Sequence, residues 1–314
     1  MPNPLRVLED RLDDDTRDLL GKDLSGRVAG RVLDSDTDAA ILGRIGAYAL
    51  RNALPGRVLD SLQGFAISGA HVLRLGNLPQ QALPATPVSG FAAEAQLPLV
   101  NAVHLGLLQI LGVLPYAVEY ENDGRLIRNV VPNPSAAGKT SSWGSDAEFF
   151  WHTDNPHLPF GELGTDPRPY PPRYLTFYAV RNEEQVPTEL VAVESAVARL
   201  PDETVRRLTA PAFAVGAPDS NDTKAELADT AVLDWRCDGH WARFDQGTTR
   251  AQTPAAEQAL REWTDALRSA ESSAPVLQPG EFLIFDNYRV LHRRRAFTPA
   301  AADRARWLRR CYAS

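Results

Sequence analysis

The amino-acid sequence predicts an α+β fold built on antiparallel strands, with a double-stranded β-helix, or jelly roll, at its core. Segments with helical spacing cluster in the first third of the chain and around residues 194–269, whereas strand-like segments dominate elsewhere. Helices and strands that are segregated along a chain in this way are typical of α+β proteins. A jelly roll with flanking helices and helical insertions fits this order, and its mouth can hold a ligand.

The chain has 314 residues, of which 44% are apolar and 23% are charged, a composition typical of globular proteins. We expect a single domain over residues 1–314. It should consist of an N-terminal arm with a short helix at 1–35, a mainly helical flank at 36–113, and a jelly-roll core at 114–314 with a helical insertion near 194–269.

The net charge of -7 at pH 7 argues against a general nucleic-acid-binding surface. Arg293–Arg295 is the one notable run of positive charge, and an anionic small molecule explains it as well as a phosphate backbone does. No signal peptide or membrane-spanning apolar stretch is visible, and Cys237 and Cys311 do not indicate a disulfide framework. We therefore expect a cytoplasmic protein that binds a small-molecule substrate, without a nucleic-acid or membrane partner. The sequence leaves the oligomeric state open.

Three helices are expected in the first third of the chain after the arm. A helix over 36–54 has apolar residues at helical spacing, and Asp36 or Asp38 can cap its first turn. A short helix follows at 56–62. Residues 101–113 are apolar on nearly every side, so this third helix should be buried.

Strands and loops are expected between and after these helices. Residues 64–75 have the composition of a strand. Residues 117–120 and 126–131 flank Asn122–Gly124, a sequence that favours a hairpin turn between two strands. Residues 133–145 are polar and contain glycine, which is typical of a functional loop.

The second half of the chain combines strands and helices. Short helices are expected at 194–200 and 202–208, and a longer one at 253–269, where Thr253 can cap the first turn. Residues 218–229 are polar and can form a mobile lid. The expected strands are 174–180, 241–245, 282–285 and 306–311.

The most informative segment is Glu148–Asn155, which contains a histidine and an aspartate two residues apart, directly after an apolar run. In a strand, residues i and i+2 point to the same face, so His152 and Asp154 can reach one point in space. A second histidine, His292, ends another apolar run. Two imidazoles and one carboxylate form the ligand set of non-haem Fe(II) oxygenases. A His-x-Asp pair alone also fits a polar loop, but the preceding strand and the downstream His292 favour a metal site.

Fe(II) in such a site keeps coordination positions open. 2-Oxoglutarate can fill two of them, and O2 can fill a third. The other carboxylate of 2-oxoglutarate must then be buried, and a buried carboxylate favours a bidentate arginine partner. We expect this partner in the arginine-rich segment 304–310.

Several segments together resemble one oxygenase family. They are His152–Asp154, Asp286–His292 and Arg306–Arg310, with further similarity at Gly124–Pro132 and Tyr174–Asn182. In these segments the chain is similar to the clavaminate synthase-like branch of the taurine dioxygenase superfamily, which includes the arginine hydroxylases of peptide-antibiotic pathways. The resemblance covers residues 36–312, nearly the whole chain.

The resemblance implies an iron centre and a place for the cosubstrate. His152, Asp154 and His292 would hold Fe(II). Thr176 would donate a hydrogen bond to the distal carboxylate of 2-oxoglutarate, and Arg306 would form a salt bridge with it. Halogenating relatives replace the metal-binding carboxylate with a small residue, so Asp154 indicates oxygen transfer or desaturation instead.

The resemblance also implies contacts with a substrate. Arg310, four residues beyond Arg306 and on the same face of a strand, matches the position that holds the substrate carboxylate in amino-acid-using members. Arg304 and Arg309 are the alternatives if the register differs. Asp245 lies near the position of an acidic contact for the guanidinium in arginine hydroxylases. Ser142 and Glu121 are further candidates to face the pocket.

The chain departs from the family pattern at three positions. Arg293 stands where glycine is common, Asp154 where amino-acid hydroxylases often have glutamate, and Gly247 where arginine hydroxylases have a second acid. His157 is near the metal motif but is expected to be a loop residue and not a ligand. His71, His104 and His240 have no partner pattern and are expected to be structural.

These observations predict an enzyme, a non-haem Fe(II)/2-oxoglutarate-dependent dioxygenase that hydroxylates a free polar or basic amino acid in secondary metabolism such as antibiotic biosynthesis. Three alternatives stay open. The substrate can be a sulfonate or a carboxylate other than an amino acid, the outcome can be desaturation or cyclisation, or the chain can be a binding scaffold without activity. The complete set of His152, Asp154, His292 and Arg306 disfavours the last alternative.

Overall fold

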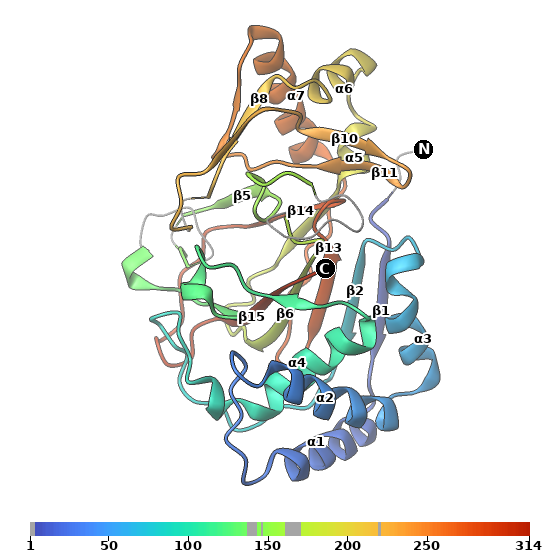
Figure 1. Cartoon of the computed structure of the whole chain (residues 1–314), viewed down its shortest axis with the longest axis vertical. Coiled ribbons are helices and arrows are strands. Elements are labelled where there is room, and N and C mark those ends of the chain that lie inside the picture. Colours follow the sequence, from blue (N-terminus) through green and yellow to red (C-terminus); the bar gives the residue numbers. More distant parts are fainter. Residues whose placement is uncertain (1–3, 137–142, 146, 161–170, 219–220) are drawn as a thin grey trace.

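The computed structural model describes residues 4–136, 143–145, 147–160, 171–218 and 221–314. Helices and sheets are both prominent, which confirms the expected mixture (Figure 1). One group of helices covers one face of the larger sheet, and a second group packs beside the smaller sheet at the opposite end of the molecule. The larger and the smaller sheet occupy the middle of the molecule between these groups, and further short strands lie among the second group of helices.

Within the described residues, the larger sheet has seven strands in the order β1-β2-β13-β6-β15-β3, with β4 also paired to β15. β1 runs parallel to β2, and the other pairs are antiparallel. The strands are β1 (Val7–Arg11), β2 (Val72–Gly76), β3 (Pro115–Tyr116), β4 (Ile127–Val130), β6 (Tyr174–Arg181), β13 (Phe282–Asp286) and β15 (Trp307–Ala313). β15 is buried along its whole length, so both of its faces contribute to the interior.

Side chains alternate along β6 and give the sheet two different faces. Thr176 points toward helix α4 (Pro98–Leu111), where its Oγ1 lies 2.9 Å from His104 Nε2. Phe177 points to the opposite, inner face and packs in one apolar cluster with Phe285 and Leu190. Because Leu190 belongs to the smaller sheet, the two sheets pack against each other through this inner face.

The smaller sheet has the order β5 (Phe149–His152), β14 (Val290–Arg294) and β7 (Glu189–Ala192). Its far face packs on α5 (Val193–Val197), α6 (Asp202–Leu208) and α7 (Pro254–Ser269), in a cluster that includes Trp151, Leu291 and Trp263. Thr253 caps α7 as expected, because its hydroxyl accepts a hydrogen bond from Ala256 N at 3.1 Å. Further small sheets are formed by β8 (Phe213–Gly216), β9 (Glu226–Thr230) and β12 (Thr249–Ala251), and by β10 (Leu233–Arg236) and β11 (Gly239–Ala242).

The helical layer on the larger sheet consists of α1 (Asp14–Val28), α2 (Ala39–Ala53), α3 (Gly56–Gly64) and α4. α2 and α4 touch backbone to backbone. A Cβ added at Gly46 would lie 1.7 Å from the carbonyl oxygen of Ala102, and one at Gly106 would meet the backbone of Gly46 at 2.5 Å. Only glycine permits this approach, which brings α4 close to α2 and seats it on the sheet.

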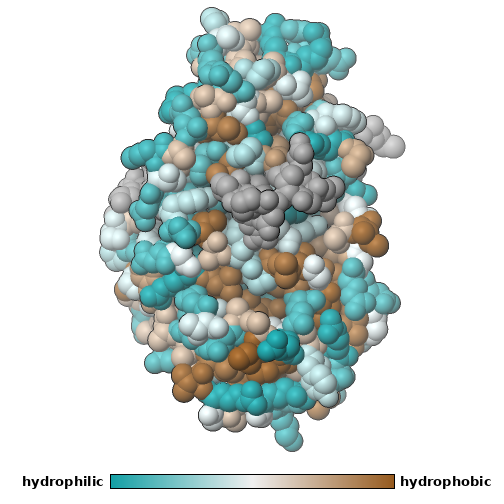
Figure 2. Space-filling view, in the orientation of Figure 1, coloured by the Kyte–Doolittle hydropathy of each residue, from teal (hydrophilic) through white to brown (hydrophobic). Residues whose placement is uncertain are grey.

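The surface in the view shown is a mixture of hydrophilic and hydrophobic residues. Hydrophilic residues dominate the upper end in Figure 2, whereas hydrophobic residues gather below the middle of this face. Exposed large apolar residues include Leu19, Tyr48, Ile67, Leu114 and Trp235, and isolated residues of this kind are normal. In the part of the chain that the structure describes, no helix combines the length and the apolar character needed to cross a bilayer.

The N-terminal segment differs from its expectation. Residues 1–35 were expected to hold an arm with a short helix, but they contain the edge strand β1 and the 15-residue helix α1. Asp13 caps α1 by accepting a backbone hydrogen bond at 2.7 Å. The expected cap of α2 is wrong, because Asp38 makes no capping hydrogen bond and Asp36 accepts one from Leu126 N at 2.8 Å instead.

The expected hairpin around Asn122–Gly124 is also wrong. These residues form a short 3-10 turn, and all three have positive φ, at 57°, 53° and 69°. The flanking strands β3 and β4 do not pair with each other. Both pair with β15 along the edge that β6 leaves free, because β15 offers a long, fully buried partner to each of them.

Candidate active site

The three residues expected to bind iron converge between the two sheets. His292 on β14 pairs directly with His152 on β5, and their ring centroids lie 4.0 Å apart. Asp154 follows β5, and its Oδ1 lies 3.4 Å from His152 Nε2 and 3.5 Å from His292 Nε2. Each side chain offers one ligand atom, and these atoms all lie within 4.8 Å of one another. Among the described residues, this is the single cluster of three or more metal-binding side chains.

The protonation of these groups suits a metal ion. His152 Nδ1 lies 2.7 Å from the carbonyl oxygen of Phe150 and donates to it, which leaves a lone pair on Nε2. That Nε2 is buried and has no hydrogen-bond partner. Burial and the neighbouring His152 lower the pKa of His292 well below its ordinary value, so its imidazole is neutral at pH 7. Burial alone would raise the pKa of Asp154, but Arg310 and the two imidazoles lower it well below the usual range.

The turn after β5 is fixed by Asn287, a residue whose role sequence reasoning did not identify. Its side-chain oxygen accepts a hydrogen bond from Asp154 N at 2.8 Å, and its Nδ2 donates to Asp154 O at 3.1 Å and Pro172 O at 3.0 Å. The Asp286-Asn287 pair in the sequence was the available signal. Asn287 thereby holds the peptide of Asp154 in place.

A pocket opens next to the triad on the inner face of the larger sheet. Its lining includes Phe149, Phe177, Thr188, Arg306 and Arg310, together with Asp154 and His292. Arg306 is 4% exposed, and its Nε is buried without a hydrogen-bond partner. Burial and the nearby charge of Arg294 lower the pKa of Arg306 to about 9. A buried guanidinium that lacks a full set of acceptors is suited to an anionic ligand.

Thr176 is not in this pocket, which corrects the expected contact with the cosubstrate. Its hydroxyl donates to Cys311 O at 3.0 Å and lies against His104 on the helical side of the sheet. Thr188, just before β7, lines the pocket together with Arg306. Sequence reasoning missed Thr188 because neither its position in the chain nor the composition around it shows which side of the segment faces the site.

Arg310 lies at the centre of a buried charge cluster beside the triad. It donates to Asp154 Oδ2 at 2.9 Å and also to Glu121 Oε1. Glu121 further accepts from Tyr312 Oη at 2.6 Å and from Arg128 at 3.1 Å. Two acids and two arginines are thus packed together, with Glu121 and Arg310 both largely buried.

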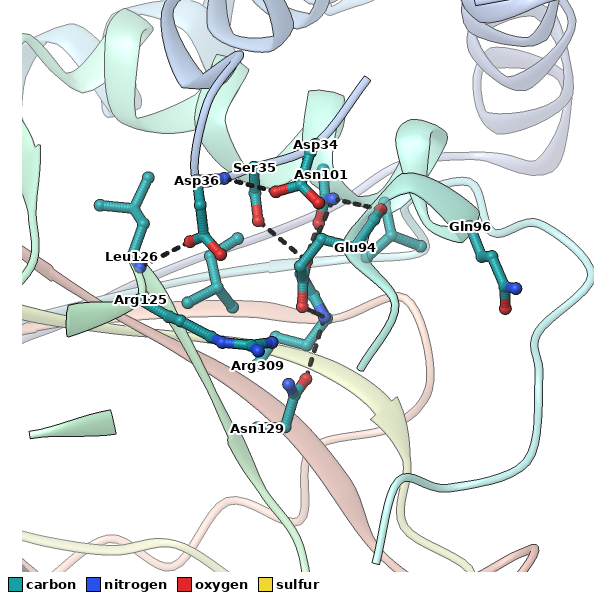
Figure 3. A network of polar contacts seen from close by, with 12 residues as sticks. Asp34, Ser35, Asp36, Glu94, Gln96, Asn101, Arg125, Leu126, Asn129 and Arg309 are labelled. Carbon is teal, nitrogen blue, oxygen red and sulfur yellow. Dashed lines mark hydrogen bonds and ion pairs between the residues drawn. The ribbon is translucent and has the colours of Figure 1, made fainter. Parts of the chain in front are cut away.

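The competing arginines lie elsewhere. Arg309 points to the helical side of β15, where it forms a buried ion pair with Glu94 and donates to Asn129 Oδ1 at 2.9 Å (Figure 3). Arg304 is 62% exposed in its side chain and lies 3.7 Å from Glu183. Arg306 and Arg310 are therefore the arginines of this segment that face the pocket.

Asp245 lies close to the triad and borders a second cavity. Its backbone forms a β-bridge with His152, and it lines a cavity of about 420 Å³ with Phe150 and Lys224. Its Oδ1 accepts hydrogen bonds from Gly247 N at 2.7 Å and from Thr248 N at 3.2 Å. Burial raises the pKa of Asp245.

Parts of the expected loops fall outside the described residues. Ser142 lies there, as do the neighbouring residues of the expected 133–145 loop and residues 219–220 of the expected lid. The described part of the lid segment touches the turn that carries the third ligand, since Asn221 Nδ2 donates to Asn155 Oδ1 at 3.0 Å.

The other histidines have neighbours away from the triad. His71 accepts from Arg289 at 2.8 Å, His104 faces Thr176, and His240 lies 2.9 Å from Glu194. His157 packs on the ring of Tyr120 at 5.7 Å.

Comparison with known proteins places this geometry in a family. Residues 111–312 match the family described as "Taurine catabolism dioxygenase TauD, TfdA family". The chain is 27% identical over 270 residues to L-lysine 3-hydroxylase of Catenulispora acidiphila, which covers 82% of this chain and 72% of the relative. It is 27% identical over 216 residues to enduracididine beta-hydroxylase of Streptomyces hygroscopicus, which covers 60% of each chain.

A solved structure supports the same assignment. Asparagine oxygenase in complex with Fe(II), 3-hydroxyasparagine and succinate superposes with a TM-score of 0.81 and 25% identity, and the match covers 97% of this chain and 92% of that one. The family expected from the motifs is thereby confirmed. The chain belongs to the taurine catabolism dioxygenase TauD, TfdA family, and it is a non-haem iron, 2-oxoglutarate-dependent dioxygenase.

Proposed function

We propose that this dioxygenase hydroxylates a free α-amino acid that has a polar or basic side chain. The observation that carries this proposal is the pair of opposite charges beside the triad. An α-amino acid presents a carboxylate and an ammonium on one carbon, and Arg310 and Glu121 offer a matching cation and anion in a buried site.

His152, Asp154 and His292 are the residues that we assign to iron. Bound there, iron would activate O2, with 2-oxoglutarate as the two-electron donor, so that one oxygen atom of O2 can be inserted into a C–H bond of the substrate. The protein's part is positional: strand pairing aligns the two imidazoles, and Asn287 fixes the peptide of Asp154.

We assign the distal carboxylate of 2-oxoglutarate to Arg306, with Thr188 as a hydrogen-bond donor in place of Thr176. Both residues line the pocket next to the triad. Phe177 and Val130 supply apolar walls there, which exclude water and strengthen the contact between a carboxylate and Arg306.

The distal end of the substrate is assigned to the cavity that Asp245 borders. One oxygen of Asp245 is held by backbone N–H groups, and the residue pairs with His152 through a β-bridge of the backbone. A buried acid favours a donor or a cation, which supports a polar or basic side chain. The names of the similar proteins, which include a lysine hydroxylase, an enduracididine hydroxylase and an asparagine oxygenase, support amino acids as the substrate class.

We also draw inferences on the architecture of the chain and on its cellular location. We infer that the two facing sheets are the halves of a double-stranded β-helix, that the chain acts as one oxygenase domain, and that it works in the cytoplasm on a small molecule.

A substrate screen tests the proposal. The purified chain with Fe(II) and 2-oxoglutarate is supplied with amino acids of different side chains, and succinate formation and product mass are measured. We expect a polar or basic amino acid to stimulate succinate formation and to gain one oxygen atom. The matched amine that lacks the α-carboxylate should give neither signal. Stimulation by taurine or a simple carboxylate, with none by amino acids, would contradict the proposal and favour the sulfonate or carboxylate alternative.

A further inference from the structure

The two oxygens of Asp154 have different partners. Oδ1 faces the Nε2 atoms of His152 and His292 at 3.4 and 3.5 Å, which is where a metal ion would be held. Oδ2 accepts a hydrogen bond from Arg310 at 2.9 Å. The side chains of Asp154 and Arg310 are 6% and 8% exposed, so salt and water screen this contact little.

Arg310 is a fixed cation in this position. Its guanidinium donates to Asp154 Oδ2 and to Glu121 Oε1, so two buried carboxylates hold it in place. The strand itself is held from its other face, because the neighbouring Arg309 is locked into the buried network with Glu94 (Figure 3). The guanidinium is therefore held both by its own partners and by the anchored strand.

The position of Arg310 has two consequences for a metal ion at the triad. Because Oδ2 is occupied by Arg310, Asp154 can offer a metal a single oxygen, which keeps more coordination positions open. In addition, a divalent ion and the guanidinium would share one carboxylate, and two cations so close repel each other more strongly in the interior than in water. This repulsion lowers the affinity of the triad for the metal.

We propose that Arg310 is a positioning residue that couples the metal site to the substrate: its charge weakens metal binding at Asp154, and the substrate carboxylate relieves this effect by pairing with the same guanidinium. The second half rests on the proposed function, whereas the first half needs only the contact between Arg310 and Asp154. Coupling between two sites is reciprocal, so a bound metal tightens amino-acid binding by the same factor. Couplings of this kind change affinity by roughly 5- to 150-fold, and we expect about tenfold here.

The first half of the proposal, that the charge of Arg310 weakens metal binding, can be tested without any substrate. The probe is Mn(II), which gives no turnover. Free Mn(II) is measured by electron paramagnetic resonance in titrations of the full chain without 2-oxoglutarate or amino acid. Arg310→Gln keeps a hydrogen-bond donor and removes the charge, and we expect it to bind Mn(II) about tenfold more tightly than the wild type. Arg310→Lys keeps the charge and should bind Mn(II) like the wild type.

Arg128 offers a matched control. It faces Arg310 across the β4–β15 pair, its side chain is 3% exposed, and it pairs with Glu121 at 3.1 Å. Arg128→Gln therefore removes an equally buried charge from the same cluster while the Arg310–Asp154 contact stays. We expect a much smaller change in Mn(II) affinity than in Arg310→Gln.

Several outcomes would overturn the proposal. Unchanged or weaker Mn(II) binding in Arg310→Gln contradicts the first half, and an equal effect in Arg128→Gln would mean that the net charge of the cluster, not the contact with Asp154, sets the affinity. If circular dichroism shows that Arg310→Gln does not fold, Mn(II) binding by the wild-type protein still tests the proposal. The amino acid that stimulates succinate formation should tighten its Mn(II) binding about tenfold, and an unchanged affinity refutes the coupling. A screen without any active amino acid would instead refute the proposed function, and the result for Arg310→Gln would stand.

Discussion

Replacement of Arg306 by methionine should make the protein more stable and at the same time unable to hold 2-oxoglutarate. Arg306 is 4% exposed, and its Nε has no hydrogen-bond partner. Its backbone N–H donates to Glu184 at 3.0 Å, a contact that methionine would keep. In the absence of a ligand, the side chain is thus a buried cation with an unpaired hydrogen-bond donor. This lowers the stability of the folded protein.

The size of that cost follows from the environment. Burial, with the charge of Arg294, lowers the pKa of Arg306 from 12.5 to about 9. One pKa unit corresponds to about 1.4 kcal/mol, so charged Arg306 destabilises the fold by at most about 5 kcal/mol below pH 9. The folded-state pKa is the lower one, so this destabilisation is complete at neutral pH and fades as the pH rises from 9 toward 12.5. Replacement of buried charges by apolar side chains typically stabilises by 1–4 kcal/mol, which corresponds for a chain of 314 residues to a rise in Tm of roughly 1.5–6 °C.

Thermal unfolding with and without 2-oxoglutarate, in the presence of Mn(II), measures both effects. 2-Oxoglutarate should raise the Tm of the wild type by mass action and leave the Tm of Arg306→Met nearly unchanged. Loss of a buried charge partner costs about 2–5 kcal/mol, so the Kd for 2-oxoglutarate should rise by at least about 30-fold. Arg304→Met is the matched control, since Arg304 is exposed and should affect neither quantity. A variant that melts below the wild type and binds 2-oxoglutarate normally would refute the reasoning.

The remaining predictions concern the other assigned residues. Asp154→Ala should weaken Mn(II) binding by more than about 100-fold and abolish turnover, because changes beyond the first ligands alone cost 10- to 100-fold; normal titration and activity would mean that the triad is misassigned. Thr188→Val should raise the KM for 2-oxoglutarate about tenfold, as expected for one lost hydrogen bond of about 1.5 kcal/mol, whereas Thr176→Val should leave that KM alone and lower the Tm; the opposite pattern in steady-state kinetics would restore Thr176 to the site. Asp245→Asn should raise the KM for a basic amino acid by about tenfold or more without changing the KM for 2-oxoglutarate, and equal shifts in both would contradict a contact with the substrate side chain.

The cluster of His152, Asp154 and His292 could be predicted because its sequence signal is local. His152 ends β5 and Asp154 follows two residues later, whereas His292 lies in the middle of β14, after an apolar run in the sequence. The pairing of His152 with His292 is a long-range event, yet each strand brings its histidine to the same end of the sheet. Once these parts of β5 and β14 lie side by side, the side chains of His152, Asp154 and His292 can adopt few relative positions.

Thr176 shows where such reasoning fails. β6 is buried on both faces, so its sequence has no apolar–polar alternation that would tell which residues face the site. The face of Thr176 is set by its pairing with Cys311 on β15 and Ile284 on β13, and neither register can be read from β6 alone. Thr188 precedes a different strand, and only the packing of the two sheets brings it next to Arg306.

The failed hairpin has the same physical origin. Asn122–Gly124 carries strong local turn chemistry, and the structure does turn there with three positive φ angles. Turn chemistry says that the chain reverses, but not which strand pairs with the flanks. β15 comes almost two hundred residues later and takes both partners, so a non-local partner overrode a correct local signal. The cap of α1 is the opposite case: Asp13 was a readable local signal that the charged composition obscured.

β15 shows how a structural contact can set a functional one. Arg309 and Arg310 are adjacent, so they point to opposite faces, one into the helical layer and the other into the site. A register shift of one residue would exchange them and bring Arg309 to Asp154. Such a shift would leave the buried Glu94 without its arginine partner, and breaking a buried ion pair costs about 3–5 kcal/mol. The ion pair on the helical face therefore fixes the register that places Arg310 beside Asp154, although Glu94 itself does not line the pocket next to the triad.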